Sequence, residues 1–332
     1  MGGSATIRSG AHREALHLLL TKAEVVMPLV SSITVFAVFT AIAPGFATPR
    51  SIAGVLSIAS ELGITTLGIA LLLISGEFNL AVSSLFILSP LVTTWLANAG
   101  VNPFAALAAS IVVAAGIGAL MGYTVVRSGL HSFIVTLGFA MFLRGLALYL
   151  TGGFPQEYEA DPSLLYALNG RMAWGFRISM AWFLLITLGL VLVLHLTKYG
   201  NWTYAAGGNP LVAHEVGVPV RKVKILNFMV SSAAAGFAGC LSLGRLGVID
   251  PSLGYGLELE SLAAAVLGGC SLTGGYGSVI GAFLGTLALS MFRVGLVLAG
   301  APPYWYQAFI GPLLIGAAAV NYLLARRALA YR

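Results

Sequence analysis

The feature that most constrains this chain is a succession of long apolar stretches without a charged side chain. A helix needs about 20 such residues to cross the hydrocarbon core of a bilayer. Hydrophobic residues make up 58% of the 332-residue sequence and charged residues only 8%, against about 25% charged in an average soluble domain. Since no water-soluble fold buries that much apolar surface, we expect an all-α membrane protein that crosses the bilayer many times.

The apolar stretches predict about ten membrane-spanning helices. They lie near residues 25–45, 52–75, 80–98, 103–126, 131–151, 178–197, 225–244, 259–271, 278–299 and 304–324. The third contains Ser83, Ser84, Pro90 and Thr93, and the eighth is short. Either is therefore expected to be a broken or re-entrant helix, and irregular backbone at that depth must line protein or water.

Lys and Arg are distributed unevenly between the predicted loops, and cytoplasmic loops are the ones that collect them. With a cytoplasmic N-terminus, the inner side holds Arg8, Arg13, Lys22, Arg127, Lys198, Arg221, Lys222, Lys224, Arg326, Arg327 and Arg332. The outer loops hold only Arg50, Arg171, Arg177 and Arg245. Both termini are therefore expected in the cytoplasm, and the net charge of +6 reflects topology rather than binding to nucleic acid.

This topology divides the chain into a cytoplasmic segment (1–24), a single transmembrane domain (25–325) and a cytoplasmic tail (326–332). We find no nucleophile elbow with plausible partners, and no Walker A motif, in which a glycine precedes the lysine. The scattered histidines lack zinc-site spacing. Cys240 and Cys270, both expected within helices, suit buried packing better than a disulfide or metal pair. The sequence therefore predicts a transport subunit rather than an enzyme, with no cofactor of its own.

One long polar segment, residues 198–224, lies on the predicted cytoplasmic side. Its glycine pair frees the backbone, Asn209 is a favourable N-cap, Pro210 suits the first helical position and Gly217 can end a helix in a left-handed conformation. These signals predict a short helix over 210–216. Because isolated helices of under about 12 residues are marginal in water, we expect this helix to dock onto a partner. A capped loop helix packed on its own domain is the alternative.

Four blocks of residues carry further information through their order and spacing. They are Gly207-Gly208-Asn209-Pro210 followed by Ala213 and Gly217; Phe133 to Gly138; Arg144 to Ala147; and Glu258-Leu259-Glu260 followed by Ala264 to Gly269 and Gly274 to Ser278. Together they resemble the ribose-type permease subunits of ATP-binding-cassette (ABC) importers for simple sugars, over most of the chain. Importers of branched-chain amino acids or nucleosides share that general architecture.

The resemblance implies a permease subunit of the bacterial inner membrane that moves a monosaccharide, or a similar polar molecule such as a polyol, into the cytoplasm by alternating access. In that family two permease copies form the pathway, a periplasmic binding protein delivers the substrate, and a separate ATPase binds ATP and magnesium. The cytoplasmic segment corresponds to the coupling helix that seats in this ATPase. Coupling roles are thereby implied for Gly207, Gly208, Asn209, Pro210, Ala213, Glu215 and Gly217.

The sequence departs from this family pattern at two places. Leu211 and Val212 replace the usual acidic residue and alanine at the start of the coupling segment, and Glu215 lies toward its end. Where relatives commonly have Gly-Gly-Ile-Asp-Leu-Ser after the second span, this chain reads Gly76-Glu77-Phe78-Asn79-Leu80-Ala81. We therefore expect a matched ATPase surface and an altered role for the 76–81 loop.

Polar side chains inside the membrane are costly and tend to face a cavity or a partner. Candidates for the substrate pathway are Glu61, Asn79, Arg144, Glu258 and Glu260. An ion pair of Glu61 with Arg144 or Arg293, holding two helices in register, is the alternative for that residue. Acidic residues at a helix start also complement the helix dipole, which is the alternative for the last two.

Two weaker patterns concern the overall arrangement. Residues 76–84 would correspond to residues 268–277 if the chain were built from two inverted halves, although glycines that only permit close helix packing explain the same pattern. The outer loop over 152–177 carries acidic residues at 157, 159 and 161 and is the expected contact for a binding protein. An ion-coupled secondary transporter and a non-transporting scaffold or receptor are the rival functions.

Overall fold

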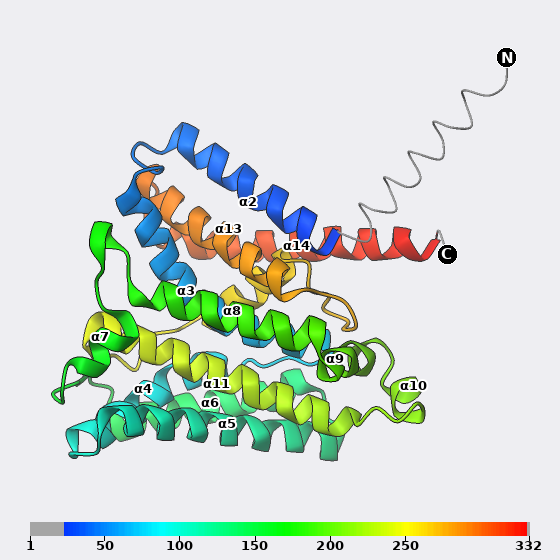
Figure 1. Ribbon diagram of the computed structural model, residues 1–332, viewed down its shortest axis with the longest axis horizontal. Coiled ribbons are helices and arrows are strands. Elements are labelled where there is room, and N and C mark those ends of the chain that lie inside the picture. Colours follow the sequence, from blue (N-terminus) through cyan, green and yellow to red (C-terminus); the bar gives the residue numbers. More distant parts are fainter. Residues whose placement is uncertain (1–22, 331–332) are drawn as a thin grey trace.

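The computed structural model describes residues 23–330 as a bundle of helices (Figure 1). Ten of the described helices correspond to the predicted spans: α2 (Ala23–Ile42), α3 (Pro49–Ile74), α4 (Val82–Asn98), α5 (Pro103–Ser128), α6 (Ser132–Thr151), α8 (Ile178–Leu196), α11 (Val220–Leu246), α12 (Leu257–Leu267), α13 (Val279–Leu298) and α14 (Trp305–Ala330). Seven of them, α2, α3, α5, α6, α8, α11 and α13, are long and apolar enough to cross a membrane. The all-α polytopic fold is confirmed.

Of the other three helices that correspond to predicted spans, α14 has a shorter apolar stretch, Trp305–Ala319, and α4 and α12 are themselves short. α12 has 11 residues, which is about 16 Å at 1.5 Å per residue and too little to cross a bilayer alone. α4 has 17 residues and begins only after an irregular segment, residues 76–81. Each of these two short helices adjoins irregular backbone, residues 76–81 before α4 and residues 268–278 after α12.

The centre of the bundle is formed by α3 and α11. Every residue of α3 from Ala59 to Ile74 is buried, and α11 packs against α3, α4 and α5. α13 in turn packs against α2 and α3. The outer helices expose apolar side chains instead, as Leu184, Leu185 and Leu188 do along α8. Large apolar side chains that stay exposed along whole outer helices are typical of a helix bundle surrounded by lipid.

The irregular segment 76–81 satisfies its backbone inside the protein. The Phe78 N–H donates to Ser132 Oγ at 3.0 Å, and the Leu80 N–H donates to Thr136 Oγ1 at 3.1 Å. Both hydroxyls belong to the first two turns of α6. Side chains of this helix therefore accept the hydrogen bonds of backbone N–H groups in the irregular segment. This confirms that irregular backbone here lines protein, as expected where no water is available.

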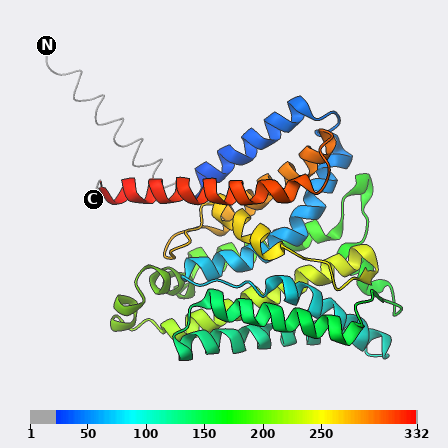
Figure 2. The same ribbon diagram turned by 180° about the vertical axis from the view of Figure 1, so that it is seen from behind.

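The two ends of the bundle carry different elements (Figure 1). At one end lie α7 (Ser163–Asn169), the turn η1 (Ala173–Gly175) and a small antiparallel ladder between β1 (Gln156–Glu157) and β2 (Val248–Ile249). The segment predicted as an outer loop is therefore partly helical. At the opposite end lie α9 (Lys198–Gly208) and α10 (Pro210–Glu215). The start of α2 and the end of α14 lie toward this same end (Figures 1 and 2).

Three sequence predictions about element boundaries are wrong. Residues 198–224 are not one loop with a short helix, because α9 precedes α10 and α11 already begins at Val220. Arg245 belongs to the last turn of α11 rather than to an outer loop. Cys240 is buried in α11 as expected, but Cys270 is buried in the turn after α12 rather than in a helix.

Candidate coupling helix and intramembrane ion pairs

The predicted cytoplasmic helix exists as α10, and its boundary signals act as expected. The Asn209 side chain accepts a hydrogen bond from the Val212 N–H at 3.2 Å, and Pro210 occupies the first helical position. Gly217 follows the helix with φ +86°, the left-handed conformation that glycine adopts without strain. The predicted helix over 210–216 is therefore confirmed to within one residue.

Sequence reasoning missed α9, which leads directly into α10. Its residues KYGNWTYAAGG include three glycines, which are poor helix formers. One signal was present, since the Thr197 side chain accepts a hydrogen bond from the Gly200 N–H and caps the helix. A tertiary contact adds support: burial raises the pKa of the Tyr199 phenol to about 12, and this protonated group donates to Asn227 Oδ1 at 2.7 Å. The glycine pair 207–208 thus ends a helix instead of freeing a loop.

α10 presents one face to its own chain and the others outward. Ala213 is buried in a small apolar cluster with Ala206, Val218, Val220 and Val223. The apolar side chains Leu211, Val212 and Val216 are exposed by 81%, 56% and 73%, and the predicted Glu215 is exposed too. Apolar side chains that project from one end of a protein mark a contact surface.

Backbone from three separate parts of the chain meets beside α10. We call this the glycine junction; it consists of Gly76 after α3, Gly207 and Gly208 at the end of α9, and Gly274 and Gly275 after α12. The Gly275 N–H donates to the Ile74 carbonyl at 2.8 Å. A Cβ at Gly207 would collide with that same carbonyl, so only glycine fits there.

A second contact reinforces the junction, because the Tyr204 hydroxyl of α9 donates to the Gly277 carbonyl at 2.8 Å. α10 is thereby attached, through α9, to both irregular segments of the bundle, residues 76–81 and 268–278. From the sequence, residues 76–84 would correspond to residues 268–277 if the chain were built from two inverted halves, with glycines for close helix packing as the alternative. The structure brings them together, and the correspondence itself stays a prediction.

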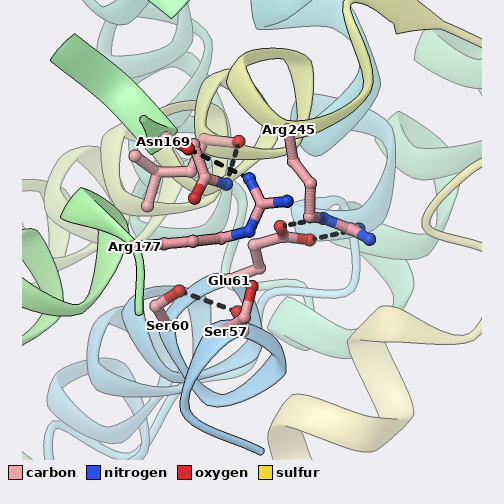
Figure 3. A network of polar contacts seen from close by, with 7 residues as sticks. Ser57, Ser60, Glu61, Asn169, Arg177 and Arg245 are labelled. Carbon is pink, nitrogen blue, oxygen red and sulfur yellow. Dashed lines mark hydrogen bonds and ion pairs between the residues drawn. The ribbon is translucent and has the colours of Figure 1, made fainter. Parts of the chain in front are cut away.

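Glu61 is buried in α3, and its carboxylate is fully engaged at the α7 end of the bundle (Figure 3). Arg245 Nε donates to Oε1 at 2.7 Å and Arg245 Nη2 donates to Oε2 at 2.9 Å. The alternative pairing of Glu61 with Arg144 or Arg293 is therefore wrong, because the ion pair is made with Arg245. The hydropathy pattern predicts the depth of each residue but not the rotation of its helix, and Glu61 faces α11.

Figure 3 shows the Arg177 guanidinium between Asn169 and the Glu61 carboxylate. Arg177 Nη1 donates to the Asn169 carbonyl at 3.0 Å, and Asn169 Nδ2 donates to the Leu241 carbonyl at 2.7 Å. The network joins α3, α7, α11 and the start of α8. Bidentate carboxylate–guanidinium contacts are among the strongest polar contacts in proteins, so Glu61 serves at least to hold these elements together.

A second ion pair lies at the α10 end. Lys224 Nζ lies 2.5 Å from Glu77 Oε1, and both side chains are largely buried. Glu77 belongs to the irregular segment 76–81 and Lys224 to the second turn of α11. Glu77 is one of the residues that depart from the family pattern. Its ion pair with Lys224 ties the irregular segment 76–81 to α11.

Asn79 and Arg144 have structural partners in the described chain. Asn79 Nδ2 lies 3.3 Å from the hydroxyls of both Ser231 and Ser232, and its Oδ1 accepts from the Ala81 N–H. Arg144 Nη1 donates to the Pro251 carbonyl at 3.5 Å, and its guanidinium lies 5.6 Å from the Tyr255 ring centre. These contacts place Asn79 against α11 and Arg144 against the loop between β2 and α12. Their pathway roles stay predictions.

Glu258 and Glu260 both lie in the first turn of α12, where acidic groups complement the helix dipole. Glu260 is buried and accepts a 3.4 Å contact from Arg293 Nη1 of α13. The structure therefore pairs one predicted pathway residue, Glu260, with a charged group that sits inside a span.

Comparison with known proteins gives one family and several relatives. Residues 51–318 match the family described as branched-chain amino acid transport system / permease component. The chain is 33% identical to the xylose/arabinose import permease protein XylH of Sulfolobus acidocaldarius, over 80% of this chain and 76% of the relative. It is 31% identical to the ribose import permease protein RbsC of Escherichia coli, over 86% and 90%. It is 29% identical to the D-allose transport system permease protein AlsC of Escherichia coli, over 88% and 90%. No solved structure matches.

Proposed function

This chain belongs to the family of branched-chain amino acid transport system permease components, and on that premise we propose that it forms the membrane pathway of an ATP-driven importer for a monosaccharide or related polyol. The observation that carries the proposal is the similarity to permeases named for xylose and arabinose, ribose and allose over most of both chains. The family description favours branched-chain amino acids as the second candidate substrate class.

The proposed partners are a separate ABC ATPase, a substrate-binding protein and a second permease copy. α10 supports the first of these, because a six-residue helix that exposes Leu211 and Val212, and is followed by the exposed Val216, has the shape and chemistry of a knob for a partner's groove. ATP and magnesium would be bound by that partner. The acidic 152–177 segment at the opposite end is the proposed contact for the binding protein.

The α10 end is the proposed cytoplasmic end. Lys198 begins α9, Arg221, Lys222 and Lys224 begin α11, and Arg127 lies in the last turn of α5. The concentration of basic side chains at this end is the pattern of cytoplasmic loops. A bacterial inner membrane with both termini in the cytoplasm fits this orientation.

Movement would pass from the ATPase to the bundle through α10. Closure of two ATPase subunits would push α10, and α9 would carry the displacement to the glycine junction. The junction contacts the irregular segments 76–81 and 268–278, which are the parts of the bundle least constrained by helical hydrogen bonds. Their displacement would open the central path alternately to either side, which is the movement that transport through a fixed site requires.

The test is reconstitution of the chain in proteoliposomes with its ATPase and binding protein. Substrate-stimulated ATP hydrolysis is measured across a panel of pentoses, hexoses, polyols and branched-chain amino acids. Stimulation by a sugar supports the proposal, and stimulation by leucine alone moves the assignment to the second candidate. Transport by the isolated chain along an ion gradient would refute the ABC mechanism.

The coupling role of α10 is tested in the same system. Leu211→Asp combined with Val212→Asp places two charges on the exposed face and is expected to abolish co-purification with the ATPase while the permease stays folded. The control is Leu211→Met combined with Val212→Ile, which keeps the face apolar. Full ATPase binding by the charged variant would show that α10 is not the contact.

A further inference from the structure

Arg293 is placed unusually for a residue of a membrane span. It lies in α13, one of the helices long and apolar enough to cross a membrane, and its side chain is 45% exposed in the single chain. A charged group at that position is costly against lipid. Instead of extending along the helix, the guanidinium contacts Glu260 of α12 at 3.4 Å and lies 5.1 Å from the Tyr306 ring centre. The surface around Arg293 therefore faces a polar space or another protein.

Several polar atoms without a hydrogen-bond partner lie on the helix of Arg293 and on the two helices that its side chain contacts. Nine buried side-chain atoms in the described chain lack a partner, and four of them lie on α12, α13 and α14: Glu258 Oε2, Ser261 Oγ, Ser290 Oγ and the Tyr306 hydroxyl. Ser261 and Ser290 are fully buried and Tyr306 is 3% exposed. A buried hydroxyl normally finds a partner, most easily a carbonyl of its own helix in a membrane protein.

Thr286 shows that α13 offers such partners. Its hydroxyl donates to the Ala282 carbonyl at 2.9 Å, whereas Ser290, one turn further along the same helix, makes no such bond. Leaving a buried polar group unpaired is unfavourable. Several such groups on helices that pack together indicate a site whose hydrogen bonds are completed by a molecule that comes and goes.

The unpaired atoms lie on facing elements. Glu258 and Ser261 are three residues apart and share a face of α12, and Ser290 and Arg293 share a face of α13 for the same reason. α12 packs against both α13 and α14. We call Glu258, Glu260, Ser261, Ser290, Arg293 and Tyr306 the α12 polar cluster.

The chemistry of this cluster selects among ligands. Each hydroxyl of a sugar both donates and accepts a hydrogen bond, so it is matched by carboxylates that accept, a guanidinium that donates and hydroxyls that do either. Two carboxylates against one guanidinium leave the ionised cluster with net negative charge, which disfavours phosphorylated or carboxylated molecules. A neutral molecule with several hydroxyls fits this combination.

We propose that the α12 polar cluster is a binding site for a neutral polyhydroxylated substrate, reached from the side on which Arg293 is exposed. The inference rests on the proposed function, because it takes the pathway of a sugar importer as given. It adds Ser261, Ser290, Arg293 and Tyr306 to the two glutamates that the sequence singled out.

The test uses the reconstituted importer with radiolabelled D-xylose and D-ribose as probes. Ser290→Ala and Tyr306→Phe each remove one hydroxyl with little change of volume. Each is expected to raise the KM for uptake on the order of three- to tenfold, as for the loss of one hydrogen bond to a neutral ligand. Thr286→Val is the matched control on α13, because its hydroxyl is already paired, and it should leave KM unchanged.

Thermal unfolding without sugar supplies a second readout. Because the two hydroxyls are unpaired, their removal should leave the melting temperature unchanged or raise it, whereas loss of a structural hydrogen bond would lower it. Sugar uptake with unchanged KM in both variants would overturn the inference and leave the proposed function standing. Loss of the permease dimer in these variants would overturn it in favour of a subunit interface. Absence of sugar uptake by the unmodified importer would refute the proposed function itself.

Discussion

Gly207 and Gly208 are neighbours in sequence, yet the structure predicts opposite responses to the same substitution. A Cβ at Gly207 would collide with the Ile74 carbonyl and lie 2.7 Å from the Gly275 nitrogen, whereas a Cβ at Gly208 would meet only Gly275 Cα at 3.8 Å. The second distance is an ordinary van der Waals contact. Gly207→Ala should therefore force the backbone of the glycine junction apart, and Gly208→Ala should be accommodated.

The magnitude follows from the contacts that are lost. Separating the segments would break the hydrogen bond from the Gly275 N–H to the Ile74 carbonyl, worth about 1 kcal/mol, and overpacking of a rigid site adds about 1–3 kcal/mol. We therefore expect Gly207→Ala to lower the free energy of unfolding by about 2–4 kcal/mol. Gly208→Ala should change it by less than about 1 kcal/mol, since alanine also favours the helix end.

The assay is thermal unfolding of the purified permease in detergent, followed by uptake in proteoliposomes. Gly189→Ala in α8 is a suitable control, because a Cβ there meets nothing within 4 Å. Gly207→Ala is expected to melt earlier, and an importer reconstituted with this variant is expected to hydrolyse ATP without matching uptake. Equal stability and equal uptake of the Gly207 and Gly208 variants would refute the close approach of the three segments.

Three further predictions concern charged side chains. Lys224→Met leaves the buried Glu77 carboxylate without its ion-pair partner and should reduce the free energy of unfolding by about 3 kcal/mol. Chemical denaturation would measure this loss, and adding Glu77→Gln should restore part of the stability. Arg245→Met should reduce the free energy of unfolding less, by about 2 kcal/mol, because Arg245 is more exposed than Lys224. A larger loss than in the Lys224 variant would contradict this order. Glu159→Lys in the outer segment should weaken uptake driven by the binding protein without changing ATPase co-purification, and unchanged uptake would remove this segment as the contact.

The features predicted from sequence are those that depend on local composition. Apolar length determines which segments can cross a membrane, and the Asn209, Pro210 and Gly217 signals act within single turns. Both were recognisable without any knowledge of tertiary contacts. The third span was also recognisable as unusual, because Ser83, Ser84 and Pro90 interrupt its apolar run, but these residues lie inside α4 and the irregular backbone comes before the helix.

The ion pairs were not predictable in the same way. Glu61 with Arg245, Glu77 with Lys224 and Glu260 with Arg293 each join residues on different helices. A hydropathy pattern gives the depth of a charge in the membrane but not the direction in which its helix turns it. α9 was missed for a related reason, since contacts of Tyr199 and Tyr204 with distant segments stabilise a sequence with weak helical propensity.

The glycine junction also constrains the order in which the protein is made. The ribosome releases the end of α3 first, α9 later and the turn after α12 last, and membrane helices enter the bilayer in that order. Until Gly275 and Gly277 have been synthesised, the Ile74 carbonyl has no Gly275 N–H to accept from and the Tyr204 hydroxyl has no Gly277 carbonyl to donate to. The nascent chain can therefore pack α9 and α10 against α11 early, but it closes the glycine junction only after α12 has been made. A permease truncated before that point would lack the contact that links α10 to the segment after α12.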